Sequence, residues 1–187
     1  MEKSVKVTSL LLGSFFVVFL INAVFVLKYN SIKSVVAADT ITVAEMKKEL
    51  ECMALNVYRE AGHEPIEGRI AVAQVTMNRV AHPDFPNTVC EVVYQKSVVY
   101  QKVVCQFSWH CDSAHRARPI NQRAYGESME VAKKVMLEKF RLNSLDEALY
   151  YHADYVNPRW RLERIEKIGQ HIFYKKKGSD HARLAGI

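Results

Sequence analysis

The chain lacks internal repeats and low-complexity segments, and it has only 7 Gly and 5 Pro among its 187 residues. These absences argue against a repeat architecture and against long flexible linkers. About 150 residues follow the first 38, which is enough for one packed domain and too few for two of ordinary size. The sequence therefore predicts one globular domain behind a short N-terminal segment.

A strong excess of charge is also absent. The chain has 26 Lys and Arg against 20 Asp and Glu, a formal net charge of +6, and residues 1–38 hold four of the lysines. The weak positive balance that remains suits an acidic polymer but does not identify one. One basic run, Lys175 to Lys177, lies near the C-terminus without a base-stacking motif. We therefore expect a solvated basic tail over residues 176–187 and no binding of nucleic acid.

The N-terminus carries the one long apolar run of the chain. Residues 10–27 are almost all apolar and have lysines on both sides. Their length lies between that of a long signal-peptide core and that of a short membrane span. The small residues Val36-Ala37-Ala38 suit a signal peptidase. We expect residues 1–38 to be a cleaved signal peptide or a signal-anchor that interacts with the membrane. Either would give an exported protein that is periplasmic, wall-associated or secreted.

Glu60 is a candidate catalytic acid because of its place in a helix predicted for residues 42–61. It lies on the same side of that helix as Met53 and Val57, which must pack inward. Gly62 then ends the helix, so the carboxylate lies near the negative end of the helix dipole. Burial and the dipole both raise the pKa of a carboxylic acid, as general acid catalysis near neutral pH requires.

The remaining periodicity predicts an α+β domain with helices packed on a small antiparallel sheet and a groove between the two parts. The helices are expected near residues 42–61, 66–81 and 121–141, with a short one over 88–94, and the strands near residues 98–108, 148–153 and 163–175. In the second strand, alternation would turn Tyr150 and His152 to one face and Tyr151 to the other.

Several short blocks follow the Glu60 segment in a characteristic order. They are Ala81 to Gln95, Gln106-Phe107-Ser108-Trp109, Tyr150-Tyr151-His152-Ala153, Trp160, and Ile168 to Tyr174. In this order and spacing the chain resembles the SleB/CwlJ-type cell wall hydrolases, a family named for spore-cortex-lytic enzymes but widespread in bacteria and their phages. The resemblance covers residues 46–175. No block is specific alone, but six in the right order make chance agreement improbable.

The resemblance implies a lysozyme-like or lytic-transglycosylase-like catalytic domain over residues 42–175, with peptidoglycan as substrate and no cofactor. Glu60 would protonate the glycosidic oxygen between N-acetylmuramic acid and N-acetylglucosamine, and the muramic acid C6 hydroxyl would attack to leave a 1,6-anhydro product. A second carboxylate, with Glu64, Asp112 and Asp154 as candidates, would instead imply hydrolysis. We favour the single acid. A hydrolytic muramidase, an amidase-type wall hydrolase and a non-catalytic peptidoglycan-binding protein remain alternatives.

The same blocks would build the sugar groove, since they mix flat apolar and hydrogen-bonding side chains. The candidate substrate-binding residues are Gln106, Phe107, Ser108, Trp109, Tyr150, Tyr151 and His152. For the aromatic residues among them, a place in the core is the alternative. Trp160 is expected to be a buried structural residue. The chain departs from the usual pattern of the family at His63 and in the charged stretch from His115 to Arg123, and these departures concern the glycan subsites.

The four cysteines, Cys52, Cys90, Cys105 and Cys111, fit an oxidising destination. Because Cys90 and Cys111 bracket the segment from Tyr94 to Trp109 as in many relatives, the resemblance implies a disulfide between them. Cys52 could then be a buried free thiol, and Cys105 could compete for either partner. Sequence alone does not decide the pairing.

Two other chemistries fit the residues less well. A zinc-like cluster could be formed by Cys105, His110, Cys111 and His115. It lacks the paired C-x-x-C or H-x-x-x-H arms of zinc sites. A thiol peptidase would need a cysteine beside a histidine such as His152 or His171, and none of the cysteines has the local setting of an activated nucleophile. We therefore expect no metal site. Separately, we expect the enzyme to be a monomer.

We predict that the protein, expressed with its N-terminus intact, reaches the far side of the cytoplasmic membrane and is cleaved after Ala38. N-terminal sequencing of the exported material should then begin at Asp39. A chain that still begins at Met1 and is extracted only by detergent would show a signal-anchor instead.

Overall fold

The computed structural model describes residues 19–29 and 42–178. The chain divides into two compact units, Met1–Thr42 and Val43–Ile187. In the first unit, residues 19–29 form a helix with mostly exposed side chains. No helix in the described ranges is both long enough and apolar enough to cross a membrane. The predicted cleavage site and the first part of the apolar run lie outside these ranges.

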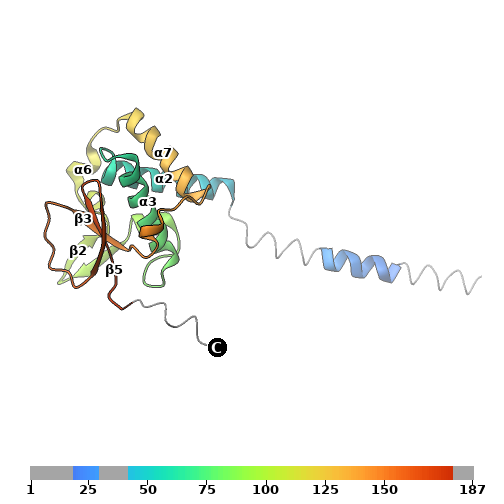
Figure 1. Cartoon of the computed structure of the whole chain (residues 1–187). Helices are drawn as coiled ribbons and strands as arrows, with labels where there is room; N and C mark the ends of the chain where they lie inside the picture. Colours follow the sequence, from blue (N-terminus) through green and yellow to red (C-terminus); the bar gives the residue numbers. More distant parts are fainter. Residues whose placement is uncertain (1–18, 30–41, 179–187) are drawn as a thin grey trace, which may run out of the picture. The chain divides into compact units, whose positions relative to one another are not determined.

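Three long helices pack together in the second unit (Figure 1). They are α2 (Val43–Ala61), α3 (Ile66–Ala81) and α7 (Gln122–Met136). Helix α3 is central, because residues 70–76 are all buried. Helix α2 turns Met53 and Val57, both fully buried, toward it. The predicted inward side of α2 and the core role of α3 are therefore confirmed.

A small antiparallel sheet lies against these helices in the order β3-β5-β4. Its strands are β3 (Tyr150–Ala153), β4 (Glu163–Ile168) and β5 (His171–Lys175). Phe173 on the central strand is fully buried and packs in a cluster with Ala71, Val75 and Leu145. Sheet and helices thus share a core, and the predicted α+β class is confirmed.

Shorter elements connect the layers. They are α4 (Val89–Val93), β1 (Lys96–Val99), β2 (Lys102–Cys105), α5 (Ser108–Cys111), α6 (Ser113–Ala117) and the 3-10 turn η1 (Asn143–Leu145). The short helix expected over 88–94 is present, with the Thr88 side chain accepting a hydrogen bond from the Glu91 amide at its N-terminus.

Three predicted boundaries were wrong. The segment expected as one strand over 98–108 is a hairpin, because Tyr100 and Gln101 both take positive φ and reverse the chain. The strand expected over 163–175 is two strands joined at Gly169, which also has positive φ. Helix α7 ends at Met136, five residues before the predicted end. Local turns at single residues thus override the hydrophobic pattern.

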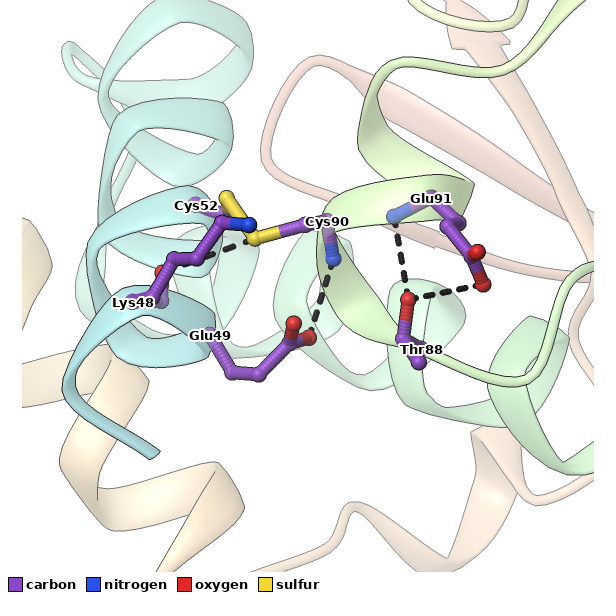
Figure 2. The surroundings of a disulfide bond; sticks show 6 residues. All are labelled: Lys48, Glu49, Cys52, Thr88, Cys90 and Glu91. Carbon is purple, nitrogen blue, oxygen red and sulfur yellow. Dashed lines mark hydrogen bonds between the residues drawn. A yellow bond between two sulfur atoms is a disulfide. The ribbon is translucent and has the colours of Figure 1, made fainter. Parts of the chain in front are cut away.

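The disulfide pairing differs from the predicted Cys90–Cys111 bond. Cys52 pairs with Cys90, and Cys105 pairs with Cys111. Cys52 lies on the side of α2 that faces the N-terminal end of α4 (Figure 2), and the Cys90 amide donates a hydrogen bond of 3.0 Å to Glu49 Oε2 there. The pairing is therefore set by which cysteines lie close together in space, and not by which of them flank the segment from Tyr94 to Trp109 in the sequence. In the described part of the chain no cysteine is left free.

We predict that the two disulfides stabilise the fold unequally, because they span 38 and 6 residues. Loop-closure entropy gives about 4 kcal/mol for the longer loop and about 2 kcal/mol for the shorter. The double change Cys52→Ala with Cys90→Ala should thus lower the free energy of unfolding more than Cys105→Ala with Cys111→Ala, measured by urea denaturation. Peptide mapping without reduction that found Cys90 joined to Cys111 would contradict this pairing.

Candidate active site

A groove in two lobes runs between the helices and the sheet. The first, here the aromatic lobe, is a cavity of about 390 Å³ whose lining includes Arg79, Gln106, Phe107, Ser108, Tyr150, Tyr151, His152 and Trp160. The second, here the cationic lobe, has about 450 Å³ and is lined by residues that include Tyr58, His63, Glu64, Arg118, Asn121 and Gln170. Both lobes are lined by Arg59, Glu60, His115, Ala153, Tyr155 and His171. Glu60 therefore lies at their junction.

The Glu60 carboxylate is held in the last turn of α2 by a hydrogen bond from the sheet. The Tyr151 hydroxyl donates to Glu60 Oε2 at 3.0 Å. Glu60 as a whole is partly exposed to the groove, but its carboxylate is enclosed by protein atoms. This burial raises the pKa of Glu60 above its ordinary value of 4.5, against the lowering effects of the Tyr151 hydrogen bond and of the positive charge of Arg79. The sequence predicted a raised pKa for Glu60, and in the structure burial is the main cause of it.

Arg79, on α3, is a site residue that the sequence analysis missed. It is 3% exposed, and its Nε donates to the Leu149 carbonyl at 2.8 Å. With the Gln106 amide oxygen turned toward it, that oxygen accepts from both terminal nitrogens at 3.2 and 3.1 Å. The guanidinium also faces the Phe107 ring at 5.1 Å. A charged residue on the buried side of a predicted core helix, in phase with Val72 and Val75, was the signal that could have found it.

No carboxylate in the described residues lies within ion-pair distance of Arg79, which is unusual for a buried guanidinium. Burial lowers the pKa of Arg79, while Tyr151 and Glu60 raise it. Arg79 therefore acts on Glu60 through space, and its charge favours the ionised carboxylate.

Strand β3 presents its side chains in the predicted alternation. The Trp160 ring contacts Tyr150 and His152 with centroids at 6.3 and 5.4 Å, whereas Tyr151 contacts Phe173 on the other face. Both His152 ring nitrogens have partners, the Ala153 carbonyl at 2.8 Å and the Tyr174 hydroxyl at 2.9 Å. A neutral ring that donates from Nδ1 and accepts at Nε2 satisfies both. The orientation of His152 is therefore fixed.

The two tryptophans differ from the sequence-based expectation: Trp109 is buried and Trp160 is exposed. Trp109 is 3% exposed and does not line the groove, and its indole N–H donates to Asn56 Oδ1 at 3.0 Å. Trp160 is 44% exposed and lines the aromatic lobe. The prediction of a buried Trp160 was wrong, since the side chain stays exposed although its ring contacts Tyr150 and His152. For Trp109, Asn56 supplies the acceptor that a buried indole needs. The other six predicted substrate-binding residues do line the aromatic lobe.

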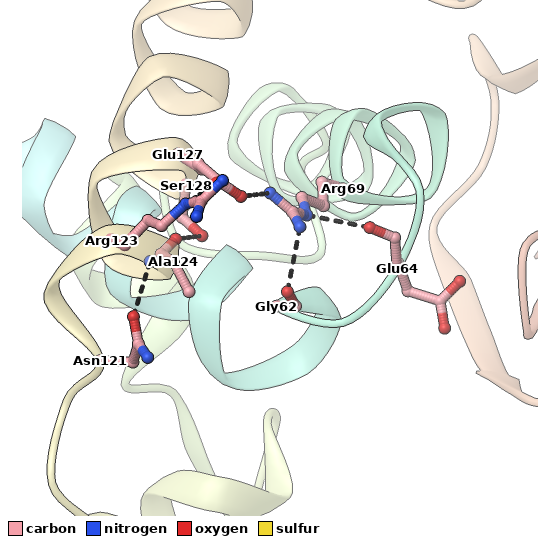
Figure 3. A network of polar contacts seen from close by, with 8 residues as sticks. All are labelled: Gly62, Glu64, Arg69, Asn121, Arg123, Ala124, Glu127 and Ser128. Atoms are coloured by element: carbon pink, nitrogen blue, oxygen red, sulfur yellow. Dashed lines mark hydrogen bonds and ion pairs between the residues drawn. The ribbon is translucent and has the colours of Figure 1, made fainter.

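The turn after Glu60 is fixed by Arg69. Its Nη2 donates to the Gly62 carbonyl at 3.1 Å, its Nε donates to the Glu64 carbonyl at 3.0 Å, and its Nη1 pairs with Glu127 on α7 at 2.8 Å. Figure 3 shows the Glu64 carboxylate pointing away from this cluster. It accepts instead from the Gln170 amide at 2.9 Å and so holds the β4–β5 turn. The end of α2 is thus fastened both to α7 and to the sheet.

Each candidate second carboxylate has a structural partner. Glu64 binds the turn just described, Asp112 accepts from the amides of Ala114 and His115 at the start of α6, and Asp154 pairs with Lys167 at 2.7 Å. Glu64 lines the cationic lobe, and the two aspartates line neither lobe. The arrangement therefore provides one carboxylate at the junction of the lobes.

The zinc-like cluster is not available as a ligand set, since Cys105 and Cys111 are joined to each other. Elsewhere in the described ranges, no group of three or more His, Cys, Asp or Glu side chains is arranged to hold a metal ion. His110 and His115 each have a pKa lowered mainly by burial.

An enclosed carboxylic acid with a raised pKa can act as a general acid, and the aromatic and polar side chains beside it can bind a ligand such as a sugar. The profile of the family described as Cell Wall Hydrolase matches residues 63–174, and the chain belongs to this family. The matched range begins three residues after Glu60, so membership of the family does not assign a role to Glu60.

Curated relatives of the chain are spore cortex-lytic enzymes. That of Bacillus cereus is 34% identical over 135 residues, which cover 69% of this chain and 45% of the relative. That of Bacillus subtilis is 31% identical over 129 residues, covering 67% and 37%. The chain thus spans less than half the length of these relatives.

Two solved structures share the fold. The catalytic domain of the Bacillus cereus SleB protein is 28% identical with a TM-score of 0.51, covering 69% of this chain and 91% of that domain. The catalytic domain of SleB from Bacillus anthracis, described as a germination-specific lytic transglycosylase, is 29% identical with a TM-score of 0.52, covering 72% and 100%. The larger unit of this chain therefore has the fold of the SleB catalytic domain.

We predict that Glu60→Gln stabilises the fold in a pH-dependent way. Because the pKa of Glu60 is raised on folding, wild-type stability falls as pH rises from about 4.5 through the folded-state pKa and then levels off. The variant lacks this fall, so its advantage should grow across that window with a slope of up to about 1.4 kcal/mol per pH unit. Urea denaturation at a series of pH values measures it.

Glu138→Gln, which removes an exposed carboxylate, is the control and should follow the wild-type curve. Parallel curves for wild type and Glu60→Gln would contradict a raised pKa at Glu60.

Proposed function

We propose that the chain is a peptidoglycan-degrading enzyme that cleaves the glycan strand between N-acetylmuramic acid and N-acetylglucosamine, with Glu60 as the single general acid and base. The observation that carries the proposal is the enclosed Glu60 carboxylate, with a raised pKa, at the junction of the two lobes. A substrate lying along the groove would have its scissile bond beside this group. Membership of the cell wall hydrolase family supports this reading.

A single carboxylic acid can complete the reaction if both of its protonation states are accessible. The protonated form, which burial favours, donates its proton to the leaving glycosidic oxygen. The carboxylate that results is stabilised by the Tyr151 hydroxyl and by the charge of Arg79. It then takes the proton from the C6 hydroxyl of muramic acid as that oxygen attacks the anomeric carbon. The product carries a 1,6-anhydro ring, and Glu60 is protonated again.

The aromatic lobe would bind the sugar rings. Trp160, Tyr150 and His152 form a cluster of contacting rings, to which Tyr174 contributes from β5. Exposed aromatic faces suit the apolar faces of sugars, and Gln106 and Ser108 beside them supply hydrogen-bonding groups. His152 positions this cluster through its fixed ring.

The alternatives predict different products. A hydrolytic muramidase would need a second carboxylate to activate water, and the candidates for that role are engaged elsewhere. An amidase-type enzyme would release peptides rather than cut the glycan. A non-catalytic binding protein would have no use for an acid enclosed at the centre of its groove. The lytic transglycosylase reaction therefore fits the residues best.

We further propose that the enzyme is exported, periplasmic, wall-associated or secreted, by residues 1–38 as a signal peptide or signal-anchor. The two disulfides support an oxidising destination. Residues 42–175 would be the catalytic domain, 176–187 a basic tail, and peptidoglycan the partner of a monomeric enzyme.

We predict that Glu60→Gln folds, binds purified peptidoglycan and loses at least 99% of the lytic activity, because it keeps the size of the side chain without the transferable proton. Mass spectrometry of wild-type products should find 1,6-anhydromuramyl ends. Glu138→Gln should lyse like wild type. Reducing ends would identify a hydrolase and free peptides an amidase, while turnover by Glu60→Gln within a few fold of wild type would remove Glu60 from the mechanism.

A further inference from the structure

The two lobes of the groove differ in charge as well as in shape. The cationic lobe holds two arginines, Arg59 and Arg118, and His63 lies exposed in it. Its carboxylates are Glu60, at the junction with the aromatic lobe, and Glu64, which is buried and bound to the Gln170 amide. Among the charged residues that line this lobe, Arg118 is therefore the exposed one, whereas Glu64 is buried and the Glu60 carboxylate is enclosed.

Arg118 is the group best placed to meet a ligand. Its side chain is exposed and forms no ion pair with another described residue. Asp112 is close enough to interact with its charge, but Asp112 Oδ1 already accepts two backbone amides. The Arg118 guanidinium thus keeps its hydrogen-bond donors for a partner from outside the described chain.

Arg59 holds the segment that carries Arg118 in place. Its Nη1 donates to the His115 carbonyl at 3.0 Å, and its Nη2 donates to the carbonyls of Arg116 and Arg118 at 3.3 and 3.1 Å. Because Arg59 directly precedes Glu60 on α2, the backbone from which Arg118 extends is tied to the proposed catalytic acid. A ligand group bound by Arg118 would therefore be held in register with the scissile bond.

We propose that the cationic lobe is a subsite for a carboxylate carried on the lactyl arm of muramic acid, with Arg118 as the specificity-determining residue. This inference rests on the function proposed above. Muramic acid would lie next to the scissile bond, so its arm would reach the lobe beside Glu60. A cavity of about 450 Å³ is larger than one carboxylate needs, which favours a peptide stem over the bare lactyl group. The enzyme would prefer glycan that bears stems.

The test compares three substrates made from sacculi free of teichoic acid, so that no phosphate competes. The first keeps its peptide stems, the second is stripped by an amidase and keeps only the lactyl carboxylate, and the third is stripped and then amidated with methylamine. Glycan cleavage, counted as new chain ends, gives kcat/KM for wild type and Arg118→Gln on each. Arg164→Gln is the matched control, because Arg164 on β4 is exposed and lines neither lobe.

Wild type should cleave the first substrate about tenfold faster than the third, the factor expected for one lost charge-assisted hydrogen bond, and Arg118→Gln should lose this preference. If the wild-type rate already falls on the second substrate, the carboxylate that Arg118 binds belongs to the peptide stem. If the wild-type rate falls only on the third substrate, the carboxylate is that of the lactyl group. Equal preferences in wild type and Arg118→Gln would overturn the inference while leaving the proposed function intact. Wild type that cleaves none of the glycans would instead overturn the proposed function.

Binding provides a measurement that does not depend on turnover. In the Glu60→Gln background, adding Arg118→Gln should weaken sedimentation with stem-bearing sacculi about tenfold, and adding Arg164→Gln should not. Equal binding by all three proteins would count against the subsite.

Discussion

The hydrogen bond from Tyr151 to Glu60 joins the helices and the sheet of the domain at the junction of the two lobes. It spans 91 residues of sequence, so it forms only when α2 and β3 are both in place. Phe173 packs against the Tyr151 ring from the central strand, and Arg79 binds the Leu149 carbonyl just before β3. The buried core and the polar site therefore depend on the same placement of one strand.

The electrostatics of Glu60 follow from the same contact. Burial alone would favour the neutral acid strongly, and an acid that cannot ionise cannot act as a base in the second half of a reaction. The Tyr151 hydroxyl and the buried charge of Arg79 both oppose burial. Arg79 fills this role without an ion pair to a described residue, since its nitrogens are used on the Leu149 carbonyl and the Gln106 amide. A direct ion pair would have held Glu60 ionised instead.

Sequence was a good guide where the signal was periodic. The phase of α2 placed Glu60 beside Met53 and Val57, and alternation along β3 separated Tyr151 from its neighbours. It was a poor guide where the outcome depends on contacts between distant segments. The exposed and buried tryptophans were interchanged because nothing near Trp109 in the sequence shows that Asn56 will accept its indole hydrogen. The cysteine pairing failed for the same reason, as the face of α2 opposite Cys90 is set by tertiary packing.

The Cys105–Cys111 disulfide closes a small covalent ring around the segment that serves both the groove and the core. Inside this ring Gln106, Phe107 and Ser108 line the aromatic lobe, while Trp109 anchors to Asn56. A segment closed by a disulfide over so few residues has little conformational freedom, which helps to keep the indole at its acceptor. Side chains on this wall of the groove can therefore be exchanged without changing the ring, whereas an insertion or deletion between Cys105 and Cys111 would change its size.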